Sequence, residues 1–125
     1  MCHRARREPT MNENPIDHAV YTELQATTGA EFVAELVDTF LEEAPGMLAE
    51  LRSARADGNS ERFRRAAHSL KSNANTFGAV NLAAQARALE LKGLDAEPTC
   101  DEAALAALEA EHMRTAAALK ALRNG

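Results

Sequence analysis

One stretch of the chain, residues 63–78, carries a pattern that allows little choice of local structure. Its apolar residues are mostly three or four positions apart: Phe63, Ala66, Ala67, Leu70, Ala74 and Phe77. At about 100° per residue, all six side chains fall within an arc of roughly 100° around a helix axis. Gly78 follows as a typical helix stop. The stretch therefore predicts one amphipathic helix with a single buried face.

The one histidine in this stretch does not share the buried face. His68 projects about 160° from Leu70 on the same helix, away from the expected core. A lone helical histidine is more often a packed core residue or an ordinary surface residue, and the helix phase excludes the core. Lys71 lies one turn on, with the small polar residues Ser72 and Asn75 on the same half of the helix. Because a neutral imidazole is a nucleophile, His68 is a candidate acceptor of a phosphoryl group.

Two helices are predicted before this stretch. The first opens at Asn14-Pro15, since asparagine suits the N-cap and proline the first helical position. It closes near Gly29. The second runs from residue 30 to about residue 56. Its apolar pattern resumes in phase after Pro45, so we expect a kinked single helix rather than two separate helices.

Two more helices are predicted after it. One covers residues 79–92 and stops at Gly93. A capping box over residues 99–102 then opens the last helix. Its inward-facing stripe follows helical spacing to the end of the chain: Leu105, Leu108, His112, Thr115, Leu119 and Leu122. This stripe is long enough to close a helical bundle.

Length and composition favour an all-α fold. The chain has 125 residues, 46% of them hydrophobic and none of them Trp, which suits one helical domain with its own core. Short connections between consecutive helices imply antiparallel neighbours. We predict an antiparallel up-down four-helix bundle over residues 14–125, with an additional short N-terminal helix covering one end. Residues 1–13 are polar and Arg-rich without a period, and we interpret them as a disordered extension.

Charge and cysteine content indicate what kind of partner and what cellular location to expect. The net charge of −5 argues against a nucleic-acid partner. Residues 61–71 nevertheless hold four basic side chains against one acidic one, which would attract an acidic protein surface. No apolar run approaches the roughly 18 residues that span a membrane. Cys2 and Cys100 show neither metal-ligand spacing nor a disulfide framework, so we expect a cytoplasmic location.

The motif Ala67-His68-Ser69-Leu70-Lys71-Ser72-Asn73, followed by Gly78, resembles the signature of histidine-containing phosphotransfer (HPt) domains. These are four-helix-bundle modules of bacterial, fungal and plant phosphorelays. The resemblance covers most of the chain after the first fifteen residues or so. It includes the upstream run Phe-Leu-Glu-Glu-Ala-Pro and the downstream run Leu-Ala-Ala-Gln-Ala-Arg-Ala-Leu-Glu.

The resemblance implies a phosphoryl carrier without kinase activity of its own. His68 would accept the phosphoryl group from a receiver-domain aspartate and pass it to another receiver. No cofactor is expected in this chain, and the Mg²⁺ for the reaction would belong to the receiver. No glycine-rich phosphate loop or kinase motif is present in the sequence to bind ATP.

Individual residues then take expected roles. Lys71, Ser72 and Asn75 would support the phosphoryl group, and Arg64 and Arg65 would help to dock the partner. HPt domains often carry glycine directly after the lysine, where this chain has serine. Two further residues complete the interpretation: Gly78 as a structural helix C-cap, and Glu90 as a solvated carboxylate, with orientation of the imidazole as its alternative role.

A metal site and two other functions are alternatives to this interpretation. A di-iron site needs paired Glu-x-x-His motifs, and only residues 109–112 provide one, so no metal site is expected. The first rival is a non-transferring module that binds or sequesters a receiver, which would need neither His68 nor Lys71. The second is a dimerisation domain of a histidine kinase, whose adjoining ATP-binding domain is missing from this sequence. We expect a monomer.

Overall fold

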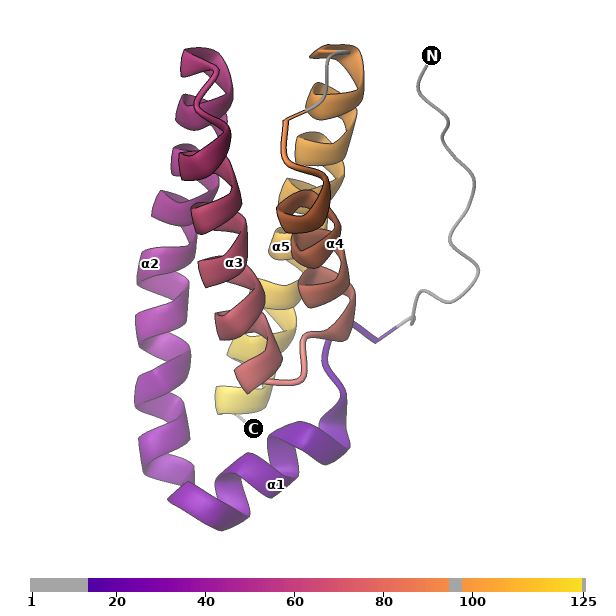
Figure 1. Ribbon diagram of the computed structural model, residues 1–125. Helices are drawn as coiled ribbons and strands as arrows, with labels where there is room; N and C mark the ends of the chain where they lie inside the picture. Colours follow the sequence, from indigo (N-terminus) through magenta and orange to yellow (C-terminus); the bar gives the residue numbers. More distant parts are fainter. Residues whose placement is uncertain (1–13, 95–97, 125) are drawn as a thin grey trace.

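The computed structural model describes residues 14–94 and 98–124 of the chain. It contains five α-helices: α1 (His18–Thr28), α2 (Ala30–Asp57), α3 (Ser60–Thr76), α4 (Val80–Lys92) and α5 (Pro98–Asn124). Helices α2 to α5 stand side by side as an antiparallel bundle, and α1 lies across one end of it (Figure 1). The predicted all-α bundle with an extra N-terminal helix is therefore confirmed. The extension predicted over residues 1–13 lies outside the described residues.

The connection between α2 and α3 shows how the sequence sets antiparallel neighbours. Gly58 ends α2 in the left-handed conformation with φ 68°, which a residue without Cβ adopts at low cost. Asn59 comes next, and its side-chain oxygen accepts a hydrogen bond of 3.1 Å from the backbone N–H of Arg62. This N-cap satisfies one of the first amides of α3. The chain thus reverses within two residues, as the sequence indicated.

Helix α2 continues through Pro45 as one element of 28 residues. The expectation of a single helix is correct. Pro45 is exposed on the outside of the bundle, and it lacks the backbone N–H that would bond to the preceding turn.

The start of α1 differs from the prediction. The helix begins at His18, not at Asn14-Pro15, and Asp17 is its N-cap. The Asp17 carboxylate accepts a hydrogen bond of 3.0 Å from the Ala19 backbone N–H. The backbone N–H of Asp17 donates a hydrogen bond of 2.7 Å to the Gly78 carbonyl. This bond to the end of α3 holds residue 17 in an extended conformation, and a helix cannot pass through it.

The predicted capping box of α5 is also shifted. The helix already begins at Pro98, one residue before Thr99, whose side chain is outside the described residues. Glu102, expected to reach back to the start of its own helix, instead binds Arg52 at 2.9 Å and Arg55 at 3.0 Å. Both arginines lie on α2. A tertiary ion pair therefore replaces the predicted local contact.

The core follows the predicted stripes. All six apolar residues of the 63–77 stripe are buried, at 8% exposure or less. On α5 the stripe is buried at Leu105, Leu108, Thr115 and Leu119. His112 in the same stripe is half-buried, with its ring centroid 6.0 Å from that of Phe40. Burial lowers the pKa of His112, because the interior disfavours the charged imidazolium.

Arginines on the outside of the bundle hold α2 to its neighbours. Arg52 binds Glu109 of α5 through two hydrogen bonds of 2.6 and 2.9 Å. Arg62 of α3 binds Glu50 at 2.8 Å and Asp57 at 2.7 Å, both on α2. Such forked pairs fix geometry as well as charge. Within the described residues, no helix is both long and apolar enough to cross a membrane.

Candidate functional site

The site is built on the exposed side of α3. His68 lies in the third turn of this helix, and its side chain is 57% exposed. Phe63 and Leu70, on the opposite side of the helix, are fully buried. The phase deduced from the sequence is therefore correct. Burial of the apolar stripe keeps α3 in place and leaves the imidazole projecting from a stiff support.

A carboxylate from the neighbouring helix holds one nitrogen of this imidazole. Glu90, on α4, places its Oε2 atom 2.7 Å from Nδ1 of His68. An ionised carboxylate can only accept hydrogen bonds, so Nδ1 must carry the hydrogen. In the neutral ring the lone pair is then on Nε2. The interpretation of Glu90 as a solvated carboxylate is wrong, because its side chain is only 24% exposed and is bound to the histidine.

The same carboxylate binds the lysine of the motif. Nζ of Lys71 lies 2.9 Å from Oε1 of Glu90, and the lysine side chain is only 22% exposed. Lys71 first, and His68 second, lower the pKa of Glu90, since both favour its ionised form. One carboxylate on α4 thus joins two residues that lie a turn apart on α3.

The model of the Hpt domain family matches residues 35–125. The chain belongs to the Hpt domain family. The match includes α3, α4, α5 and most of α2, and therefore all three residues of the site. No curated protein and no solved structure matches the chain at a significant level.

Membership supplies the general function. Hpt domains carry phosphoryl groups on a histidine within phosphorelays, interact with receiver domains and are not kinases. Histidine phosphotransfer is therefore the activity implied for this chain. Among the described residues, no group of three or more His, Cys, Asp or Glu side chains is arranged to hold a metal ion.

The structure places the two small polar residues of the motif around His68. Ser72 and Asn75 are both exposed on α3. At about 100° per residue they flank the histidine, within roughly 40° of it on the helix surface. Both side chains are short and polar.

The two arginines expected to dock a partner point to different sides. Arg64 lies against the C-terminal end of α4, where a Cβ added to Gly93 would come within 2.7 Å of its Nε atom. A guanidinium at this position also suits the negative end of the helix dipole. Arg65 lies on the other side of α3, facing α2, and is 3.5 Å from Glu61. The sequence did not separate these two roles.

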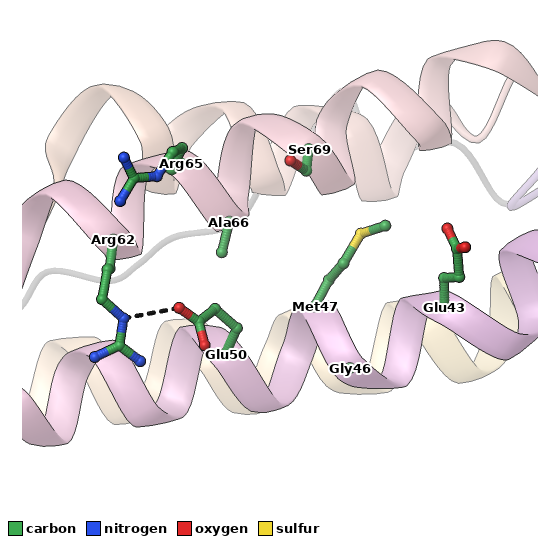
Figure 2. A pocket seen from close by; sticks show the side chains of 8 residues that line it. All are labelled: Glu43, Gly46, Met47, Glu50, Arg62, Arg65, Ala66 and Ser69. Atoms are coloured by element: carbon green, nitrogen blue, oxygen red, sulfur yellow. Dashed lines mark hydrogen bonds and ion pairs between the residues drawn. The ribbon is translucent and has the colours of Figure 1, made fainter.

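A groove between α2 and α3 opens on the Arg65 side. It has a volume of about 430 Å³, and Figure 2 shows the side chains that line it. Met47 and Ala66 point into the gap between the two helices, and the Arg62–Glu50 ion pair crosses it at one end (Figure 2). Ser69 also lines the groove. Ser69 follows His68 directly in the sequence, so the groove adjoins the candidate phosphoacceptor.

The tertiary structure reduces the predicted basic character of this region. Arg62 is bound to Glu50 and Asp57, and Lys71 is bound to Glu90. These acidic residues come from α2 and α4, outside residues 61–71, so a count along the sequence does not include them. The local excess of positive charge inferred from the sequence is thus largely balanced in the folded domain.

Gly78 lies at the junction of α3, α4 and α1. Its φ of 77° is in the left-handed region. A Cβ at this position would lie 2.7 Å from Cβ of Val20 and 3.0 Å from the Asp17 carbonyl oxygen. Glycine is therefore required here by both conformation and space. It lies away from His68, at the end of the helix, in keeping with a structural role.

Proposed function

We propose that this Hpt domain, formed by residues 14–125, accepts a phosphoryl group on Nε2 of His68 from a receiver-domain aspartate and passes it to a second receiver. One observation carries the proposal. His68 projects into solvent with its Nδ1–H held by Glu90, so the lone pair of Nε2 is directed outward.

The chemistry needs no proton to change place. The Nε2 lone pair attacks the phosphorus of the aspartyl phosphate, the P–O bond to the aspartate breaks, and the aspartate leaves as a carboxylate. The ring becomes a phosphoimidazolium whose Nδ1–H remains on Glu90. In the onward step an aspartate oxygen of the second receiver attacks phosphorus, and the N–P bond electrons return to Nε2. Transfer is thus reversible at this site.

Neighbouring residues assist in different ways. Lys71 offsets charge on the phosphoryl oxygens, and Ser72 and Asn75 leave room for the partner and offer hydrogen bonds. Arg65 and the α2–α3 groove form one docking region, and Arg64 forms another beside α4. The receiver supplies the Mg²⁺ that its own aspartate chemistry requires.

Transfer from a panel of receiver domains tests the proposal. Each phosphorylated receiver is incubated with the protein, which is then examined for acid-labile, alkali-stable label. We expect labelling of the native protein by at least one receiver and none of a His68→Gln variant. Persistent labelling of the variant would place the phosphoryl group elsewhere.

The same experiment separates the rival functions. A module that only sequesters a receiver would bind native and His68→Gln protein equally and exchange no phosphoryl group with either. A dimerisation domain of a kinase would be a dimer in light scattering. We propose a monomer, because transfer as described needs one copy of His68.

A further inference from the structure

The lysine of this site is already engaged before any phosphoryl group arrives. Its Nζ lies 2.9 Å from Oε1 of Glu90, and both side chains are about three-quarters buried. The other oxygen of the same carboxylate holds Nδ1 of His68 at 2.7 Å. The Glu90 carboxylate therefore contacts the imidazole of His68 through one oxygen and the ammonium of Lys71 through the other.

From this arrangement we propose that Glu90 competes with the phosphoryl group for Lys71, and so keeps the phosphorylated form of His68 ready to discharge. The inference rests on the proposed function, since it concerns the phosphoryl group on His68. It assigns Glu90 a second action on the same site, separate from its bond to the imidazole.

Charge balance gives the physical reason. Without a phosphoryl group, the ammonium of Lys71 and the carboxylate of Glu90 offset each other's charge. A protein-bound phosphoryl group adds a charge of about −1.5 to −2 near neutral pH, and the phosphoimidazolium ring formed with it offsets one unit of that charge. A single ammonium, compact and strongly solvated, must then serve two anions.

Partial burial strengthens the electrostatic interactions of Lys71 and Glu90. Charges that are mostly shielded from water interact through a lower effective dielectric than freely exposed ones, and salt screens them less. Movement of Lys71 toward the phosphoryl oxygens weakens its pair with Glu90. The phosphorylated state therefore gains less from Lys71 than it would if the lysine were free, and onward transfer is favoured.

The decisive variant is Glu90→Gln. The amide oxygen still accepts a hydrogen bond from Nδ1, but the residue no longer carries the charge that holds Lys71. We expect the equilibrium between the phosphorylated receiver and phosphorylated His68 to shift toward His68 by about two- to fivefold, the range of a partly exposed ion pair. The receiver is the one that transfers fastest in the panel, and the phosphorylated fractions are separated on a phosphate-affinity gel.

A double-mutant cycle tests whether the effect acts through the lysine. In a Lys71→Ala background, Glu90→Gln should no longer shift the equilibrium toward His68, because no ammonium remains to be released. Glu23→Gln, on the exposed side of α1, removes the same charge away from the site and should leave the equilibrium unchanged. Circular dichroism should show the same helicity for all variants.

The outcomes are distinct. A shift that disappears in the Lys71→Ala background supports the competition. An unchanged equilibrium in Glu90→Gln, or an equal shift in both backgrounds, would overturn it while native His68 is still labelled. Failure of every receiver to label the native protein would instead overturn the proposed function, and this inference with it.

Discussion

At the scale of single residues, the site depends on how one carboxylate is shared. His68 and Lys71 lie three positions apart on α3, but this spacing alone does not fix the orientation of either side chain. Glu90, 22 positions from His68 in the chain, supplies it through contacts of 2.7 and 2.9 Å. One carboxylate therefore links the two side chains of α3.

Removal of the lysine amine should therefore affect transfer more than folding. In Lys71→Ala we expect phosphoryl transfer to slow by about three- to tenfold, because a charged hydrogen bond to the phosphoryl group is lost from a site that water partly screens. Rapid-quench kinetics with a phosphorylated receiver measures the rate. Helicity should be unchanged, and a loss of helical signal would show that Lys71 is structural.

Because of His112, the free energy of unfolding should depend on pH even at pH values above those at which carboxylates titrate. Burial lowers its folded-state pKa below the usual 6.5, so the unfolded chain takes up this proton first as the pH falls. Stability contributed by the neutral ring is complete above about pH 6.5 and decreases below it. Urea midpoints at pH 7.5 and 5.5 measure the effect. His112→Leu should reduce the difference, and an unchanged difference would contradict this explanation.

At the scale of helices, Gly78 joins three elements. It ends α3, its carbonyl accepts from the start of α1, and α4 begins two residues later. The position of α1 across the end of the bundle depends on this close contact, since Val20 lies where a side chain on residue 78 would be.

Gly78→Ala should accordingly destabilise the domain. A left-handed φ and a contact of 2.7 Å with Val20 both oppose a Cβ. We expect a cost of about 2 kcal/mol and a melting temperature lower by roughly 10 °C. Gly46→Ala is the matched control. It lies within α2 with no heavy atom within 4 Å of a new Cβ, and should gain up to about 1 kcal/mol. Equal effects of the two substitutions would contradict the account of Gly78.

At the scale of the whole molecule, ion pairs join α2 to both of its long neighbours. Arg52 reaches Glu102 and Glu109 of α5, and Arg62 of α3 reaches Glu50. Arg52 lowers the pKa of Glu102 and Glu109, and Arg62 lowers the pKa of Glu50. The carboxylates are thus more readily ionised in the folded chain than in the unfolded one.

These lowered pKa values predict that the folded state loses stability in acid. A carboxylate with a lowered folded-state pKa stabilises the fold fully above its unfolded value of about 4.5, and this stability is lost as the pH falls through the folded pKa. We expect thermal midpoints to drop as the pH falls below about 4.5. Arg52→Met should make that drop shallower, because Glu109 loses its arginine and Glu102 keeps only Arg55. An identical acid profile in the variant would rule out these pairs as its cause.

Much of this protein was determined by sequence alone. Spacing of apolar residues predicted the helices, because burial of one face requires that period. The phase of α3 put His68 on the surface, since Leu70 and Phe63 fix which side is inward. Glycines such as Gly58 marked the ends of helices, where a left-handed conformation excludes most other residues. These features depend on neighbours along the chain.

Other features were decided only by the tertiary structure, because they depend on residues brought together from distant positions. The bond of Glu90 to His68 requires α4 to lie beside α3 at one particular height. The basic excess of residues 61–71 was reduced by carboxylates from α2 and α4. The start of α1 moved to His18 because the Asp17 amide binds the end of α3. The sequence placed His68 on the surface of α3, and packing of the helices brought the Glu90 carboxylate to its Nδ1.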